Sequence, residues 1–151
     1  MIESFTGENR FLSNFYQSDI TVEDKVYPTV EHFYQSKKAS NSKDAELIRT
    51  AKTPGLAKKL GRQIKLRSGW EAMKVNVMLV GLTLKFEDPT LRAMLMRTHP
   101  HSLIEGNDWG DEIWGMDNTS QTGQNLLGIL LMLIRAENIL KDIRRLGKWE
   151  W

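Results

Sequence analysis

Cysteine is absent from this 151-residue sequence. Its absence excludes disulfides, thiolate metal sites and a cysteine nucleophile, and it fits a reducing cytosol. Proline is scarce, with four residues, and histidine scarcer still, with three: His32, His99 and His101. These histidines lack the spacing of a metal-ligand set. We therefore expect no metal and no cofactor.

Long apolar runs are also missing. The longest, residues 126–134, contains Gly128 and is far shorter than the ~20 residues that a membrane-spanning helix needs. Residues 1–4 lack the basic and apolar regions of a signal peptide. We expect a cytoplasmic protein with no membrane partner.

The charge excess is small, because 21 Lys and Arg face 19 Asp and Glu, for a net charge of +2. This balance does not indicate nucleic-acid binding. One local basic cluster does occur, and it comprises Lys58, Lys59, Arg62, Lys65 and Arg67. A solvated helix face and loop explains the cluster, whereas a phosphate-binding patch would make binding sensitive to salt.

The composition, 40% hydrophobic and 26% charged, is typical of one globular domain, here residues 1–151. The β-prone segments 20–22 and 25–27 predict a hairpin. Start and stop signals predict helices over residues 29–39, 42–50, 53–61, 68–86, 90–97 and 124–146, with a short strand at 101–105. The predicted fold is mainly α (α+β), a single compact helical domain with a small β-hairpin.

Several predicted helices begin at a capping side chain. The hydroxyls of Thr29, Ser42 and Thr53 can accept from the first free N–H groups of a helix. Ser68 with Glu71 has the spacing of a capping box. For the helix that follows, apolar spacing predicts a core stripe of Trp70, Met73, Val77, Val80 and Leu84.

The last predicted helix is apolar nearly all round in its first half, which is typical of a helix central to a fold. Trp149 and Trp151 follow it, and we expect them to pack against the domain.

A polar stripe on the helix that starts at Thr29 is the first candidate site. Glu31, Gln35 and Lys38 are spaced i, i+4 and i+7, so they share one helix face. A buried polar group costs free energy unless it is paired, so this stripe either faces solvent or lines a site. By itself, a solvated Glu–Gln–Lys ladder would explain the spacing.

The loop of residues 106–122 is the second candidate, because long loops in small domains are usually functional. Trp114 precedes a glycine, which leaves room for a planar ligand, and Asp111 supplies another carboxylate. Residues 123–125 start a helix, where free N–H groups attract phosphate or carboxylate. Structural alternatives remain: Trp114 as a core anchor, Asp111 as a turn former and Asn125 as a cap.

Six segments carry a resemblance to a known family: residues 11–16, 29–39, 57–62, 70–78, 111–115 and 123–135. They occur in the order found in the NADAR family, which includes the YbiA-like N-glycosidases. The sequence resembles this family from Phe5 to about Ile139. The resemblance implies hydrolysis of an N-glycosidic bond between a (phospho)ribose or ADP-ribose moiety and a nitrogen, as in riboflavin-biosynthesis intermediates. Lys37 and the tail after Ile139 carry no family role.

Carried over residue by residue, the resemblance implies two sets of positions. The catalytic set is Glu31, Lys38 and Asp111, and the substrate-binding set is Asn14, Gln35, Arg62, Lys74, Trp114 and Asn125. Positive charge builds on the sugar as the C1′–N bond breaks, so a carboxylate at the anomeric carbon stabilises the transition state and can activate water. We expect Glu31 in this role.

The other positions have several possible roles. Asp111 would orient the water or bind sugar hydroxyls. Lys38 would neutralise a phosphate, protonate the departing nitrogen, or attack the opened sugar aldehyde as a Schiff-base nucleophile, and this last role needs a neutral amine. Trp114 would stack on the base or sugar, while Arg62 and Lys74 would hold phosphate.

Three hypotheses follow. The expected partner is a phosphorylated ribosyl or nucleotide-like small molecule. One alternative is ADP-ribosylated nucleic acid, for which the protein would be an ADP-ribosyl-guanine DNA glycohydrolase. The other is a non-catalytic module that binds ADP-ribose or a nucleotide, since stacking and phosphate clamping do not require turnover. All require Glu31, Lys38 and Trp114 to meet around one cavity.

Overall fold

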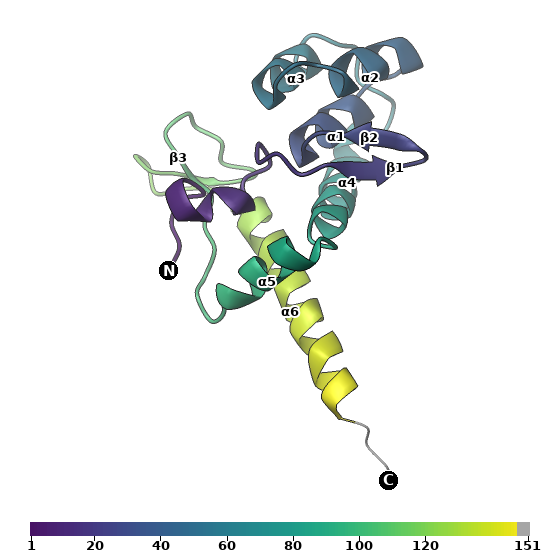
Figure 1. Cartoon of the computed structure of the whole chain (residues 1–151). Coiled ribbons are helices and arrows are strands. Elements are labelled where there is room, and N and C mark those ends of the chain that lie inside the picture. The colour runs from purple at the N-terminus through teal and green to yellow at the C-terminus, as the bar shows by residue number, and fades with distance from the viewer. Residues whose placement is uncertain (148–151) are drawn as a thin grey trace. The chain divides into compact units, whose positions relative to one another are not determined.

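The computed structural model describes residues 1–147, so the expected packing of Trp149 and Trp151 lies outside the described residues. In this part of the chain one 3₁₀ helix, six α-helices and two small two-stranded sheets form, which confirms the mainly α (α+β) class (Figure 1). The chain divides into a central unit, Asn14–Asp88, and a terminal unit, Met1–Ser13 with Pro89–Trp151. The prediction of one domain over residues 1–151 stays a prediction.

The central unit begins with the predicted hairpin. Strands β1 (Ile20–Val22) and β2 (Lys25–Tyr27) pair antiparallel, with Ile20 opposite Tyr27. The turn residues Glu23 and Asp24 have φ values of 51° and 60°. Positive φ at both central residues is typical of the tight turn that matches the twist of a two-residue hairpin.

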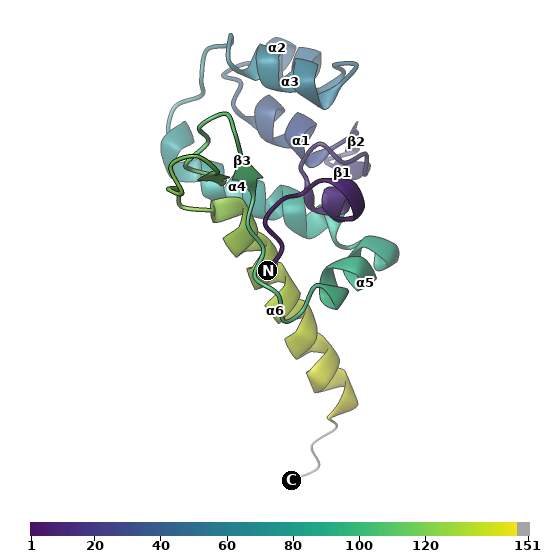
Figure 2. The ribbon, with the colours of Figure 1, turned by 90° about the vertical axis from the view of Figure 1, so that its left-hand side faces the viewer.

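Four helices follow in this unit: α1 (Val30–Lys37), α2 (Ser42–Arg49), α3 (Pro54–Gly61) and α4 (Trp70–Lys85). Helix α1 lies between the α2–α3 pair on one side and α4 on the other (Figures 1 and 2). Every residue of the 30–36 segment is consequently buried. Polar side chains on α1 are therefore held inside the unit.

Two of the predicted caps are confirmed. The Thr29 hydroxyl accepts from the His32 N–H at 3.2 Å, and the Thr53 hydroxyl accepts from the Leu56 N–H at 3.1 Å. Helix α2 is capped by Asn41, one residue before the predicted Ser42. These caps satisfy N–H groups that a helix start leaves open.

The capping box predicted at Ser68 is wrong. Helix α4 starts after Gly69, which has φ 75° and provides no side-chain cap. The left-handed conformation of Gly69 moves the helix start past Ser68, since this conformation favours glycine. Glu71 instead forms an ion pair with Lys74 at 2.5 Å.

The core stripe predicted for α4 is confirmed at Trp70, which is buried, and at Val77 and Leu84, which pack against the core cluster, but it is wrong at Val80. Val80 is 47% exposed, whereas the buried residues of the helix are Trp70, Met78, Gly81, Leu82 and Lys85. A Cβ at Gly81 would lie 2.9 Å from Phe33 Cδ1, so α1 and α4 pack closely at this glycine.

The terminal unit holds η1 (Gly7–Leu12), α5 (Pro89–Arg97), the parallel pair β3 (Gly106–Asn107) and β4 (Met116–Asp117), and α6 (Leu126–Leu146). Helices α5 and α6 lie side by side (Figure 2). Arg92 Nη2 donates to Asp142 Oδ1 at 2.7 Å. The strand predicted at 101–105 is reduced to one bridge between Leu103 and Ile2.

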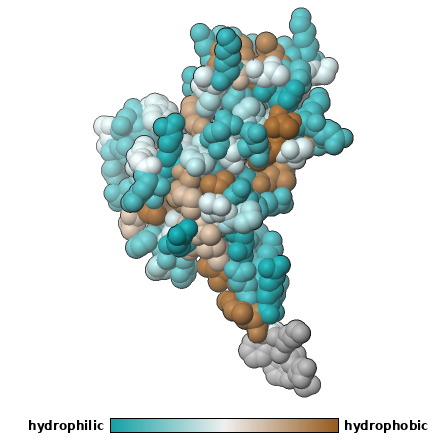
Figure 3. All heavy atoms as spheres, viewed as in Figure 1, coloured by the Kyte–Doolittle hydropathy of each residue, from teal (hydrophilic) through white to brown (hydrophobic). Residues whose placement is uncertain are grey.

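Helix α6, whose first half is apolar nearly all round in sequence, buries one side only. Leu131 is fully buried, whereas Ile129 and Leu133 are 48% and 43% exposed. Apolar surface is also visible toward the end of α6 (Figure 3). No helix within residues 1–147 is long and apolar enough to cross a bilayer.

The cap at Thr29 leads to a prediction about stability. The Thr29 hydroxyl also bonds His32 Nδ1 at 2.8 Å, and Thr29 is 1% exposed. We expect Thr29→Ala to lower the free energy of unfolding by about 1–3 kcal/mol, because it removes a cap and leaves a buried ring nitrogen without its partner. Urea denaturation measures the change. Thr29→Ser keeps the hydroxyl and serves as control; an equal loss in both variants would contradict the assignment.

Candidate active site

A buried carboxylate and amide form the centre of the candidate site. Glu31 is 6% exposed and Gln35 is 4% exposed. Gln35 Nε2 donates to Glu31 Oε1 at 2.7 Å, one helical turn away on α1. The shared face predicted from the spacing is confirmed, and the two side chains are not a solvated ladder.

Lys38 lies at the end of α1, as its C-cap residue. Its Nζ is 5.2 Å from the centroid of the Tyr34 ring, and that ring is 5.2 Å from the Trp70 ring at an interplanar angle of 60°. An ammonium over an aromatic face is attracted by the ring quadrupole. The side chain of Lys38 is therefore half-buried against an aromatic wall.

The surroundings of Lys38 lower the pKa of its amine. Burial lowers the pKa of Lys38 below its ordinary value, and the nearby cations Lys58 and Arg62 lower the pKa further. The carboxylates of Glu31 and Glu71 act in the opposite direction. Because the net pKa shift is downward, more of the amine is neutral at a given pH than for an exposed lysine.

Asn14 joins Glu31 at the start of α1. The Asn14 carbonyl accepts from the Glu31 N–H at 3.1 Å, and Asn14 Nδ2 points to Met78 Sδ at 3.3 Å. Asn14 is 8% exposed, and its Oδ1 is buried without a hydrogen-bond partner in residues 1–147. A buried amide oxygen of this kind is an acceptor that a ligand hydroxyl can satisfy.

The two basic positions of the central unit differ in their surroundings. Arg62 is exposed at the C-cap of α3, and its charge acts on Lys38. Lys74 is bound to Glu71. The central unit therefore gathers Asn14, Glu31, Gln35, Lys38 and Arg62, whereas a phosphate-binding role for Lys74 would require exchange of its ion pair.

In the terminal unit, Asp111 shapes the 106–122 loop. Its Oδ1 accepts from the N–H groups of Ile113 at 3.2 Å and Trp114 at 2.9 Å. An aspartate that bonds backbone N–H groups two and three residues on is a turn former. Asp111 therefore acts as a turn former through Oδ1. A catalytic role for Asp111 stays a prediction.

Asn107, which the sequence did not single out, organises the same loop. It is 1% exposed, its Oδ1 accepts from the N–H groups of Trp109 and Asp111, and its Nδ2 donates to the carbonyls of Asp111 and Met116. The only signal in the sequence was an asparagine in a loop rich in Gly and Asp, where such side chains bond the backbone.

The start of α6 corrects another prediction. The N–H groups of residues 124–127 donate to the carbonyls of residues 112–115, so the free N–H groups expected there for phosphate or carboxylate do not occur. The Asn125 amide is similarly engaged, since Oδ1 accepts from the Glu105 N–H at 3.0 Å and Nδ2 donates to the Leu103 carbonyl at 2.9 Å. The loop itself caps this helix.

Two further features lie outside the candidate set. His32 bonds the Thr29 hydroxyl and, through Nε2, the Ala51 carbonyl at 3.0 Å, while burial lowers the pKa of His32. It ties α1 to the segment before α3, a structural role. Among residues 1–147, no group of three or more His, Asp or Glu side chains is placed to hold a metal ion.

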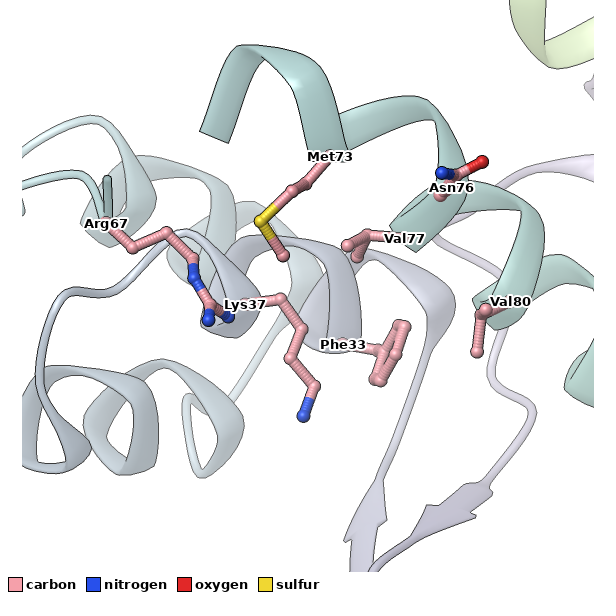
Figure 4. A pocket seen from close by; sticks show the side chains of 7 residues that line it. All are labelled: Phe33, Lys37, Arg67, Met73, Asn76, Val77 and Val80. Atoms are coloured by element: carbon pink, nitrogen blue, oxygen red, sulfur yellow. The ribbon is translucent and has the colours of Figure 1, made fainter. Parts of the chain in front are cut away.

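A hollow of ≈ 290 Å³ lies between α1 and α4 (Figure 4). Successive residues of a helix are turned by about 100°, so Phe33 and Lys37 lie on the α1 face opposite Glu31. The lining is Phe33, Lys37, Arg67, Met73, Asn76, Val77 and Val80. None of the predicted site residues belongs to it, so we do not assign the substrate to this hollow.

Comparisons with known proteins identify the family of the chain. The NADAR domain profile matches residues 3–138, and the chain belongs to the NADAR domain family.

Particular relatives are similar over most of the chain. N-glycosidase YbiA of Escherichia coli (strain K12) is 40% identical over 128 residues, which cover 83% of this chain and 79% of that protein. Riboflavin biosynthesis protein PYRR, chloroplastic, of Zea mays is 34% identical over 143 residues, which cover 83% of this chain and 23% of that protein. The NMR structure of E. coli YbiA superposes with a TM-score of 0.82 at 34% identity, covering 95% of this chain and 89% of that chain.

Proposed function

We propose that this protein is a hydrolase that cleaves the N-glycosidic bond between a ribose-type sugar and a nitrogen. The observation that carries the proposal is the buried Glu31 carboxylate, fixed by the Gln35 amide at 2.7 Å on a helix whose 30–36 segment is buried throughout. A rigid element places a reacting group more accurately than a loop does. Relatives named N-glycosidases support the reaction class.

In the proposed reaction, the C1′–N bond breaks and its electron pair goes to the nitrogen, which takes up a proton. The water oxygen forms a new bond to C1′ and gives a proton to Glu31. The carboxylate also stabilises the positive charge that develops on the sugar. The products are the free base and the free sugar.

Lys38 has three roles compatible with its position. As an ammonium it would neutralise a phosphate or protonate the departing nitrogen. As a neutral amine it would condense with the opened sugar aldehyde, losing water to form a Schiff base that hydrolysis later resolves. Burial and the charges of Lys58 and Arg62 lower the pKa of Lys38, which increases the neutral fraction relative to an exposed lysine.

The remaining positions would bind the substrate. Arg62 and Lys74 would hold phosphate, and the Oδ1 of Asn14 would accept from a sugar hydroxyl. Trp114 would stack on a base or sugar. For Asp111 and Asn125, whose side chains hold the loop and helix start of the terminal unit, contacts with substrate remain predictions.

The substrate class that we propose is a phosphorylated ribosyl or nucleotide-like small molecule, in particular an intermediate of riboflavin biosynthesis. The name of the maize relative supports this choice. ADP-ribose attached to guanine in DNA is the second candidate, favoured by Lys58 and Arg62 near Lys38. A cytoplasmic location also stays a prediction.

A product assay tests the proposal and separates its substrates. The protein is incubated with phosphorylated riboflavin intermediates, ADP-ribose and ADP-ribosylated DNA, and release of the free base or of ADP-ribose is followed. We expect release from the riboflavin intermediates. Release from DNA alone, falling steeply with salt, would favour the second candidate. Tight binding of a ligand without any product would instead identify a non-catalytic module.

The charges around Lys38 lead to a prediction about pH. Lys58→Gln removes a cation that lowers the pKa of Lys38, so this pKa will rise; Glu71→Gln removes an anion that raises it, so the pKa will fall. If the neutral amine reacts, turnover rises with pH through the pKa of Lys38. That limb will then move to higher pH in the first variant and to lower pH in the second.

Turnover measured across a pH series decides between the roles of Lys38. A limb that falls with rising pH, moving in the same two directions, would identify the ammonium as the active form. A profile that neither variant moves would mean that Lys38 does not control turnover.

A further inference from the structure

Gly61, the last residue of α3, lies directly against the amide of Gln35. A Cβ added to Gly61 would overlap Gln35 Oε1 and would lie 2.9 Å from Gln35 Cδ and 3.2 Å from its Cβ. Gly61 is itself buried. The place that the Gln35 amide occupies therefore exists only because Gly61 has no side chain.

The chemistry of the amide fixes its orientation. A carboxylate accepts hydrogen bonds and does not donate, so the NH₂ end of Gln35 must face Glu31. That end donates to Glu31 Oε1 at 2.7 Å. The oxygen end faces Gly61 and is buried without a hydrogen-bond partner in the described part of the chain. A buried oxygen without a partner costs free energy, so its position is not explained by its own bonding.

We propose that Gly61 is a positioning residue for the Glu31 carboxylate. The missing side chain at Gly61 admits the Gln35 oxygen, and the Gln35 amide then reaches Glu31 and holds its Oε1. This inference rests on the proposed function, in which Glu31 acts at the anomeric carbon. It adds a residue of α3 that acts on the carboxylate through Gln35.

An alanine at Gly61 would be accommodated by movement of Gln35 and not by loss of the fold. The overlapping atoms are the end of a flexible side chain, and Gly61 has no left-handed φ that would exclude alanine. Once the amide has moved, Glu31 loses the hydrogen bond from Gln35 Nε2. Misplacement of a reacting group by about 1 Å costs on the order of 10²-fold in rate, so we expect kcat of Gly61→Ala to fall 10- to 100-fold, by this same estimate.

The matched control is Gly55→Ala in the same helix. A Cβ at Gly55 meets only Thr53 Oγ1, at 3.9 Å, which is an ordinary contact. We expect Gly55→Ala to keep wild-type kcat, with the unfolding temperatures of both alanine variants close to that of the wild type. A role in α3 packing alone would lower the unfolding temperature of Gly61→Ala and leave kcat per folded molecule unchanged, which would overturn the proposal.

A double-mutant cycle tests whether Gly61 acts through Gln35. Gln35→Ala removes the amide, so adding Gly61→Ala to it should cause no further loss of kcat. An equal further loss in the Gln35→Ala background would overturn the proposal. If Gly61→Ala alone fails to fold, folding of the double variant supports the inferred overlap, and its failure to fold contradicts it.

Nuclear magnetic resonance separates this inference from the proposed function. The Gln35 side-chain NH₂ signals are assigned by their loss in Gln35→Ala and then compared between wild type, Gly61→Ala and Gly55→Ala. We expect them to shift in Gly61→Ala only. Unmoved signals would overturn the positioning role, even if no tested substrate is hydrolysed. Shifted signals with an inactive wild-type protein would contradict the proposed function and leave the Gly61–Gln35 coupling standing.

Discussion

Glu31→Gln will remove most of the hydrolytic turnover, roughly 10²- to 10⁴-fold, which is the range that a positioned general base contributes. The substitution replaces a carboxylate oxygen by a neutral amide, which neither takes a proton from water nor balances positive charge on the sugar. In the wild type, Gln35 Nε2 donates to Glu31 Oε1 at 2.7 Å. The amide oxygen of the new glutamine can accept the same hydrogen bond. Fold and ligand affinity should therefore stay near wild type.

Three measurements check this prediction: kcat, ligand affinity by calorimetry, and the unfolding temperature. Glu46→Gln is the matched control, because Glu46 is an exposed acid on α2 that pairs with Arg49. We expect Glu46→Gln to keep wild-type kcat. Undiminished kcat in Glu31→Gln would end the proposed role of the carboxylate.

Lys38→Ala is expected to have the second large effect, a loss of at least about 10²-fold in turnover. Each proposed role of Lys38 needs its nitrogen near the sugar, and alanine supplies none. Borohydride added during turnover distinguishes the roles. A Schiff base would be reduced to a stable secondary amine, so mass spectrometry should find the sugar attached to the peptide that contains Lys38.

The neighbouring lysine provides the control. Lys37 points to the other side of α1, where its Nζ is 5.3 Å from the centroid of the Phe33 ring. Lys37→Ala should keep turnover and the borohydride adduct. Wild-type turnover in Lys38→Ala would dismiss the covalent route and the proton-donor route together. Lost turnover without any adduct would leave the ammonium roles.

Much of the central unit could be predicted from sequence because its signals are local. The Glu23–Asp24 turn and the caps at Thr29 and Thr53 depend on residues close in the chain. The burial of Gly81 in α4 depends instead on contact with Phe33 and Val30 of α1, which residues 68–86 alone do not encode. The left-handed Gly69 also overrode a plausible capping pair.

In the candidate site, too, local spacing could be predicted from sequence and tertiary contacts could not. Glu31 and Gln35 are one turn apart on one helix, so spacing alone predicted their shared face, while their burial depended on the neighbouring helices. Gly61 is remote from Gln35 in sequence, and its role is visible only once α3 lies against α1. The bonds of Asn107 and Asn125 likewise depend on the closure of a loop.

The most direct test is a single-turnover experiment with a phosphorylated riboflavin intermediate and excess protein. Mass spectrometry quantifies the intact substrate, the free base and the free sugar phosphate over time, for wild type and for Glu31→Gln. We predict that the wild type converts the substrate into equal amounts of base and sugar phosphate, while Glu31→Gln holds it intact. Substrate that the wild-type protein binds and leaves whole would contradict the account.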